Sequence, residues 1–176
     1  VCVMMLLAGY NIWLAMLGAF IVGMLTGLAT GLLHTACGIP PILSGILTQL
    51  SLYSINLKIM GKANQAINVD KFDLLVSLRY IKNVPLFENT ILIVAVAIVL
   101  LILVLYWFFG TELGCSLRAT GCNDKMARAQ GINTDFSRVL ALMIANGLVA
   151  LAGSLLGQYQ GFADINMGRG AIVIGL

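Results

Sequence analysis

Charge is scarce in this sequence. Only 10 % of its 176 residues are charged, whereas 60 % are hydrophobic. In a soluble domain about a quarter of the residues are charged, and a water-soluble fold could not bury so much apolar surface. The scarcity of charge therefore excludes an ordinary soluble domain and predicts an integral membrane protein. The net charge of +3 is small, and the basic residues form no patch interleaved with aromatic residues, so we expect no nucleic-acid binding.

Signatures of catalysis, metal binding and self-driven transport are also missing. The single histidine, His34, stands at the end of an apolar run, where an interfacial polar residue is a simpler interpretation than a proton relay. The four cysteines have neither CxxC spacing nor a neighbouring histidine, so we expect free thiols, no metal and no cofactor. We find no nucleophile–base pair and no GxxxxGK[ST] phosphate loop, so we expect neither an enzyme nor an ATPase. No carboxylate lies inside a long apolar run, which argues against a proton- or sodium-driven carrier.

Long apolar runs are what the sequence does contain. They predict about four complete membrane spans, at residues 12–33, 42–57, 91–109 and 139–157. The sequence also begins and ends inside apolar runs, so we expect a fragment with partial spans at both ends. The predicted fold is all-α, a polytopic transmembrane helical bundle that forms a single domain over residues 1–176.

Glycines spaced four residues apart mark two of the predicted spans. Gly23, Gly27 and Gly31 place small side chains on one face of the first span, and Gly153 and Gly157 repeat the spacing in the last. A row of small residues allows another helix to approach closely. We therefore expect these glycines to serve helix packing.

Polar side chains inside two other predicted spans are costly if they face lipid. Gln49 and Asn56 are seven residues apart and so share a helix face, and Asn146 lies within the last complete span. These residues either line a wet path or tie helices together by hydrogen bonds. The sequence leaves both interpretations open.

A compact polar helix is predicted within the segment 110–138, in the stretch CNDKMARAQGIN. Asn123 is a suitable N-cap, Asp124 places negative charge at the positive end of the helix dipole, and Gly131 is suited to the position just after the helix. A helix of about two turns is not stable alone in water. It must pack on something, and on spacing alone both a partner protein and the lipid headgroups are candidates.

The stretch LRATGCNDKMARAQGINTDFSRVLAL, residues 117–142, resembles the coupling region of permease subunits from bacterial ABC importers of the branched-chain amino-acid type. Its continuation, ANGLVALAGSLLGQYQGFADINMGRGAIVIGL, is similar to the subgroup linked to tryptophan and tyrosine uptake. The resemblance extends over about the whole chain and is more specific for a permease than for any one solute. The residues that match the coupling pattern are Arg118, Ala119, Gly121, Asn123, Ala127, Arg128, Gly131, Ile132 and Asn133.

The resemblance implies a multi-pass transport subunit of the bacterial inner membrane that carries a small solute, preferably an aromatic amino acid. Its implied partners are a separate ABC ATPase, an extracytoplasmic substrate-binding protein, a second permease chain in a homodimer, and the lipid bilayer. Segment 110–138 would be the cytoplasmic coupling region and segment 58–90 an extracytoplasmic loop. For a permease, Gln49, Asn56 and Asn146 are the candidates for the translocation path, with hydrogen bonding between helices as the alternative role. The implied ATPase-coupling residues are Arg118, Asn123, Asp124, Lys125, Met126, Ala127, Arg128 and Gly131.

Charge counting does not support this orientation. Segment 58–90 has five Lys and Arg residues and segment 110–138 has four, so the positive-inside rule slightly favours the first segment in the cytoplasm. We give the resemblance more weight than a difference of one residue. Three alternatives stay open at this point: an ABC permease for a nucleoside or sugar, an ATP-independent channel or secondary carrier, and a purely structural membrane scaffold.

Overall fold

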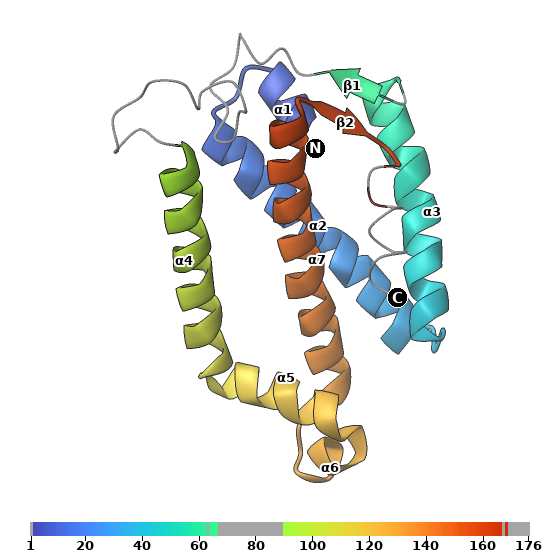
Figure 1. Cartoon of the computed structure of the whole chain (residues 1–176). Helices are drawn as coiled ribbons and strands as arrows, with labels where there is room; N and C mark the ends of the chain where they lie inside the picture. Colours follow the sequence, from blue (N-terminus) through green and yellow to red (C-terminus); the bar gives the residue numbers. More distant parts are fainter. Residues whose placement is uncertain (1, 63, 67–89, 167, 169–176) are drawn as a thin grey trace.

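The computed structural model describes residues 2–62, 64–66, 90–166 and 168 (Figure 1). Most of the predicted 58–90 loop and the partial span expected after residue 170 lie outside the described residues. The described chain is mainly helical, as expected, and adds one two-stranded sheet that the sequence did not predict. Its elements are α1 (Cys2–Leu7), α2 (Ile12–Thr35), α3 (Pro41–Met60), β1 (Asn64–Ala66), α4 (Thr90–Phe109), α5 (Glu112–Cys122), α6 (Asp124–Ala129), α7 (Thr134–Gln160) and β2 (Phe162–Asp164).

The closest helix pair is α2 and α7, which cross in the middle of the molecule (Figure 1). Gly23, Gly27 and Gly31 of α2 all face the α7 backbone. A Cβ atom added to Gly27 would lie 2.7 Å from the Cα of Met143, and one added to Gly31 would lie 3.0 Å from the Cα of Val139. The row of glycines therefore lets the two backbones touch, which is the geometry that small residues permit in membranes.

The start of the chain is a separate short helix. Gly9, with φ of +85°, breaks the chain between α1 and α2, a conformation that glycine adopts without steric cost. Cys2 and Leu6 of α1 then pack against Ala15 and Ala19 of α2. This small cluster is the principal hydrophobic core among the described residues.

Helix α3 is bonded to α2 in its first half and is joined to α7 through the sheet that follows its last residue. Pro41 occupies the first turn, where its missing N–H costs nothing. Thr30 of α2 donates a hydrogen bond from its hydroxyl to that of Thr48, at 3.0 Å. Beyond the other end of α3, β1 pairs antiparallel with β2, with Gln65 opposite Ala163. The sheet thereby joins the end of α3 to the end of α7.

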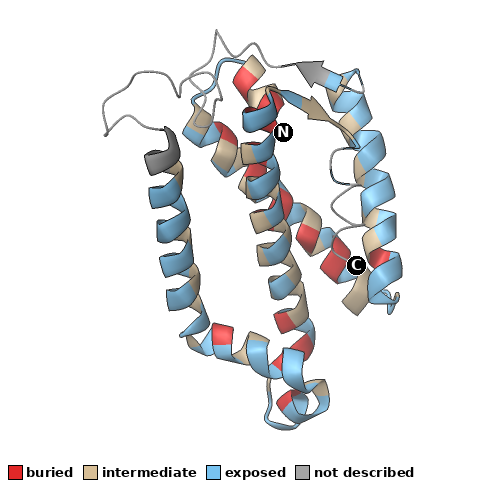
Figure 2. Cartoon of the chain, viewed as in Figure 1, coloured by how far each residue is buried: buried red, intermediate tan, exposed pale blue. Residues whose placement is uncertain are grey.

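Two described helices, α2 and α7, are long and apolar enough to cross a membrane, and α4 and α5 would form a third span if their pair is counted as one. The chain bends by 78° at Gly110 and Thr111, between α4 and α5, so α5 leaves the direction of the apolar helix α4. The prediction of four complete spans is therefore met only in part. The predicted span at 42–57 is a helix, α3, but its serine, threonine, asparagine and glutamine residues make it less apolar than the others. Figure 2 shows that α3 and α4 are exposed along most of their length in this chain.

Candidate functional site

Helices α5 and α6 and the start of α7 form the end of the molecule opposite the β1–β2 sheet (Figure 1). Helix α5 was not predicted. Thr111 caps it, because its hydroxyl accepts a hydrogen bond from the Gly114 N–H at 3.4 Å. A Cβ atom on Gly114 would lie 2.5 Å from the Cα of Phe109, so only glycine permits α5 to fold so closely against the end of α4. Threonine followed by glutamate is the sequence signal that could have revealed this helix start.

Helix α6 has the boundaries and caps that the sequence predicts. The Asn123 side chain accepts a hydrogen bond from the Met126 N–H at 3.1 Å. At the other end, Gly131 has φ of +83°, its N–H donates to the Arg128 carbonyl, and the Ile132 N–H donates to the Ala127 carbonyl. This pair of hydrogen bonds is the Schellman motif. Two fixed ends hold a helix of only six residues in a defined shape.

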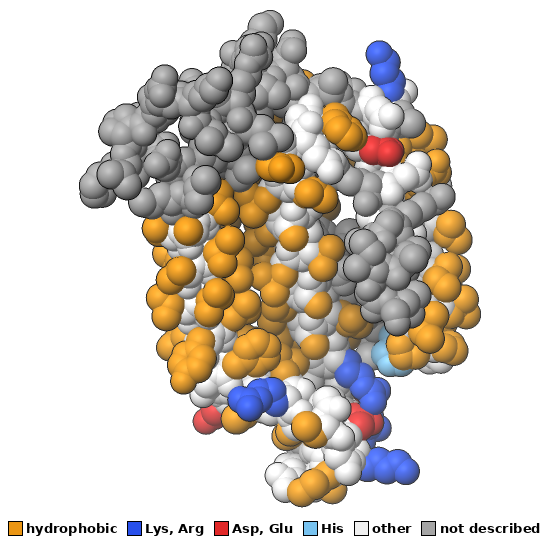
Figure 3. All heavy atoms as spheres, viewed as in Figure 1, with side chains coloured by type: hydrophobic (Ala, Val, Ile, Leu, Met, Phe, Trp, Pro, Cys, Tyr) orange, Lys and Arg blue, Asp and Glu red, His pale blue; other side chains and the backbone are white. Residues whose placement is uncertain are grey.

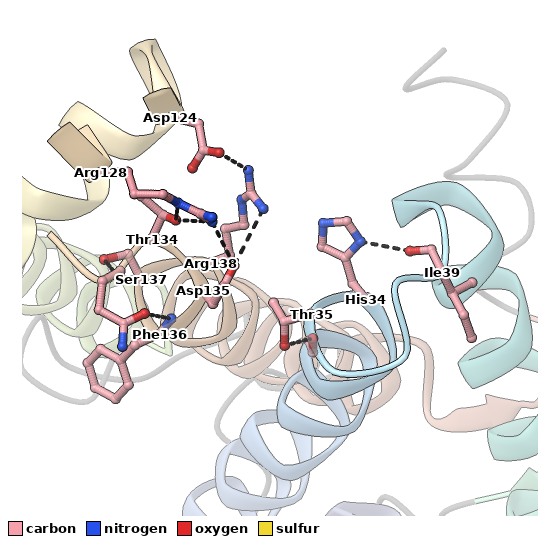
Figure 4. Close-up of polar contacts among 12 residues, drawn as sticks. His34, Thr35, Ile39, Asp124, Arg128, Thr134, Asp135, Phe136, Ser137 and Arg138 are labelled. Carbon is pink, nitrogen blue, oxygen red and sulfur yellow. Dashed lines mark hydrogen bonds and ion pairs between the residues drawn. The ribbon is translucent and has the colours of Figure 1, made fainter. Parts of the chain in front are cut away.

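A cluster of charged and polar side chains joins α6 to the first turns of α7 (Figure 4). We call it the α6–α7 junction, and it consists of Asp124, Arg128, Thr134, Asp135 and Arg138. Arg138 pairs with Asp124 at 2.8 Å and approaches Asp135 at 3.7 Å. Arg128 donates two hydrogen bonds to the Thr134 hydroxyl, at 2.8 and 3.2 Å, and a longer one to Asp135 at 3.4 Å. Both ends of α6 are thus bonded to the same helix.

The junction is partly shielded from water. Thr134 is 1 % exposed, and the side chains of Asp124 and Arg138 are 34 % and 35 % exposed. The Oδ1 atom of Asp124 is buried and has no hydrogen-bond partner within the described residues. Without Arg138, the Asp124 carboxylate would stay partly buried with no cation beside it. This costs more stability than the loss of a fully exposed ion pair.

The opposite surface of α6 faces outward. Met126 is 62 % exposed, Lys125 is exposed, and Arg118 of the preceding helix is exposed as well. Neither Lys125 nor Arg118 forms an ion pair with any residue that the structure describes. Figure 3 shows Lys and Arg side chains gathered at this end of the molecule, beyond the hydrophobic side chains of the long helices. The outward face of α6 offers one apolar side chain beside cations available to a partner.

The eight residues predicted to couple to an ATPase therefore separate into two groups. Arg118, Lys125 and Met126 point outward. Asn123, Gly131 and the buried Ala127 shape α6, and Asp124 contributes to the junction. Arg128 belongs both to the outward-facing residues and to the junction, because its side chain is 59 % exposed while it bonds Thr134 and Asp135. Sequence reasoning missed Thr134, Asp135 and Arg138, although their position at the start of a capped helix was a usable signal.

The predicted path residues lie on other helices, away from α6. Gln49 is exposed on α3, and Asn56 is half-buried on the same helix. Asn146 of α7 donates from its side chain to the carbonyl of Leu142, at 3.0 Å, within its own helix. The structure does not bring these three side chains into one cluster.

The predicted packing glycines also differ in their surroundings. Gly157 is buried, and a Cβ atom added to it would lie 3.8 Å from the Cγ2 of Val3. A Cβ atom added to Gly153 would meet nothing within 4 Å among the described residues. By contrast, Gly147 of α7, which was not among the predicted packing residues, lies closely against Phe20 and Met24 of α2. The contact between α2 and α7 thus uses glycines from both helices.

Metal-binding geometry is not found in the part of the chain that the structure describes. No group of three or more His, Cys, Asp or Glu side chains comes together there. The four cysteines are free thiols, of which Cys2 is buried and the other three are exposed. The chemistry of this site is that of a charged and apolar contact surface.

A family model described as the permease component of the branched-chain amino acid transport system matches residues 1–176. The tyrosine transport system permease protein of Clostridioides difficile (strain R20291) is 42 % identical over 163 residues, which are 92 % of this chain and 52 % of that protein. An uncharacterised protein of Rickettsia prowazekii (strain Madrid E) is 36 % identical over 169 residues, 95 % of this chain and 57 % of that protein. The autoinducer 2 import system permease protein of Yersinia pestis (strain Pestoides F) is 32 % identical over 170 residues, 95 % of this chain and 46 % of that protein.

The chain spans about half the length of the curated relatives it matches. No solved structure matches it significantly.

Proposed function

The chain belongs to the branched-chain amino acid transport permease family of ABC transporters, and we propose that it forms part of the membrane-spanning subunit of a bacterial ABC importer. In this proposal the protein is a multi-pass component of the inner membrane. It works with a separate ATPase, an extracytoplasmic binding protein and a second permease chain. Helix α3 is then a further span, whose polar residues face a wet path instead of lipid.

The observation that carries the proposal is the outward face of α6. A helix of six residues stands at one end of the bundle, is capped at both ends, and exposes Met126 beside Lys125. An exposed large apolar side chain with neighbouring cations is suited to an apolar groove that is edged by carboxylates. The ATPase subunit is the partner that this surface would meet if segment 110–138 lies in the cytoplasm.

The proposed cycle follows from differential binding. The binding protein delivers the solute at the β1–β2 end, and ATP binding draws the two ATPase subunits together at the α6 end. Energy enters as the different affinity of these partners for the inward- and outward-facing states. Gln49, Asn56 and Asn146 are our candidates for residues along the path.

We propose an amino acid as the solute, with an aromatic one favoured, because the most similar of the relatives named above is a tyrosine permease. A nucleoside or sugar is the second candidate within the same class. The similarity to an autoinducer 2 import permease shows that the relatives of this chain are not all named for one solute. An ATP-independent channel or carrier is the alternative of another class. It predicts solute flux from the full-length protein in vesicles that contain no ATPase.

The orientation of α6 is tested with thiols already present in the chain. Cys115 and Cys122 are exposed on α5, so a full-length protein that lacks Cys2 and Cys37 carries reporters next to α6. We expect a membrane-impermeant maleimide to label inverted vesicles and to leave intact cells unlabelled. Labelling of intact cells would place α6 outside and would refute the proposal.

Docking is tested at the exposed methionine. We expect Met126→Asp to abolish co-purification of the ATPase subunit, because a carboxylate cannot replace an apolar anchor in a groove. The conservative Met126→Leu should retain it, since it keeps the apolar volume. Equal recovery of the ATPase with both variants would exclude α6 as the docking element.

A further inference from the structure

Helix α6 is too short to move the bundle unless something fixes it to a longer helix. One route runs back through Asn123 into α5, which packs against α4 and also against α7. The other runs through residues 130–133 into α7. When a docked partner displaces α6, the neighbouring helix that is held more firmly to α6 moves with it. The side-chain contacts of α6 show which helix that is.

The polar contacts favour α7. Asp124 at the start of α6 pairs with Arg138, and Arg128 near its end bonds Thr134 and Asp135. In the described chain, no side-chain hydrogen bond or ion pair joins α6 to α5, although the two helices pack together. All three polar connections of α6 thus end on the first turns of α7 (Figure 4).

Helix α7 in turn is joined closely to α2. The glycine row of α2 places the two backbones in direct contact, and these contacts begin at Val139, one residue beyond Arg138. Helix α4, by contrast, packs mainly against α5 and stands apart from α2 and α7 (Figure 1). A displacement that enters α7 at Arg138 is therefore passed to α2 by backbone contact.

We propose that Arg138 is a positioning residue whose ion pair with Asp124 fixes α6 to α7, so that movement of the docked α6 moves the α2–α7 pair as one body. This inference rests on the proposed function and adds the route by which motion leaves the ATPase contact. Asp124 then holds the helix in place and does not contact the ATPase. Arg138 faces the interior of the junction, with its side chain about one-third exposed.

The test measures how much transport each ATP supports. The complete importer, made of permease, ATPase and binding protein, is reconstituted in proteoliposomes, and tritiated tyrosine is the probe. We expect Arg138→Met to lower the tyrosine taken up per ATP hydrolysed by about 2- to 30-fold, the range found when residues that couple two sites are changed. The ATPase should still co-purify in normal amount, because the outward face of α6 is unchanged. Arg138→Lys, which retains the positive charge, should restore most of the coupling.

A double-mutant cycle separates the ion pair from general damage to the fold. If Arg138 acts through Asp124, the double variant Asp124→Asn/Arg138→Met should couple no worse than Arg138→Met alone. The proposal would be overturned if the loss of uptake per ATP in the double variant equalled the product of the losses in the two single variants. Normal uptake per ATP by Arg138→Met would overturn it as well. Loss of ATPase binding by Arg138→Met would also overturn it, since Arg138 would then belong to the docking surface.

Met126→Asp distinguishes failure of this inference from failure of the proposed function. If Met126→Asp releases the ATPase while Arg138→Met couples normally, only the positioning role is wrong. If Met126→Asp retains the ATPase, the docking assignment fails, and the role of Arg138 fails with it.

Discussion

Replacing Gly27 with alanine tests whether the direct contact between α2 and α7 holds the bundle together. A Cβ atom at position 27 would collide with the carbonyl oxygen of Leu142 and would lie 2.7 Å from the Cα of Met143. Both are backbone atoms, which cannot escape by changing rotamer. The helices would have to separate, and the neighbouring contacts of Gly23 and Gly31 would loosen with them.

The magnitude follows from two opposing effects. Carbon atoms prefer separations of about 3.5–4.0 Å, so α2 must move by roughly 1 Å to admit the methyl group. Overpacking against fixed atoms costs up to about 3 kcal/mol, whereas alanine in place of glycine stabilises a helix by up to about 1 kcal/mol. We expect a net loss of about 2 kcal/mol, which corresponds to a melting midpoint lower by about 3 °C for a protein about twice as long as this chain, like the relatives it matches.

Gly153→Ala is the matched control. It lies on α7, where an added Cβ would meet nothing within 4 Å among the described residues. We expect it to retain or slightly raise the midpoint, because only the helix-propensity gain applies. The assay is thermal melting of the full-length protein in detergent, followed by size-exclusion chromatography. Equal midpoints for the two variants would refute the reasoning, since the loss would then not depend on close approach of the two backbones.

Two further predictions concern the turn after α6 and the first helix. Gly131→Ala forces alanine into a positive φ, at a cost of about 1–2 kcal/mol. It should therefore speed hydrogen exchange of the α6 amides more than Gly131→Asn does, and identical exchange in both variants would contradict the Schellman motif. In the folded protein, a small maleimide should modify Cys37, Cys115 and Cys122 quickly and Cys2 only after unfolding, because Cys2 is buried against α2 and α7. Intact mass counts the modified thiols, and rapid modification of all four would contradict that packing.

Local features of the fold were predictable because they depend on neighbours in the sequence. Asn123 caps α6 as expected, and Gly131 ends α6 as its position indicated. Asn133 caps α7 by the same local hydrogen bond. Each of these signals acts over three or four residues. The spacing of Gly23, Gly27 and Gly31 likewise predicted a face for close packing, but it could not name α7 as the partner, because that choice depends on how distant segments meet.

The junction could not be predicted for the same reason. Arg128 stands on a short polar helix and was expected to contact a partner, yet its guanidinium also bonds Thr134 beyond the turn. That contact depends on the direction in which residues 130–133 return the chain. Arg138 was counted only as a basic residue, because nothing in its local sequence indicates that it reaches back to Asp124.

The β1–β2 sheet bears on the order in which the chain assembles. Its two strands are three residues each and belong to segments that are far apart in the sequence, on either side of α4 to α7. Closing so long a loop costs on the order of 4 kcal/mol in chain entropy, and an isolated pair of strands is only marginally stable in water. The sheet therefore forms only after α2 has brought α3 and α7 together. It should form after the contacts among α2, α3 and α7 and be lost before them, so protection of its amides reports that these three helices have been assembled.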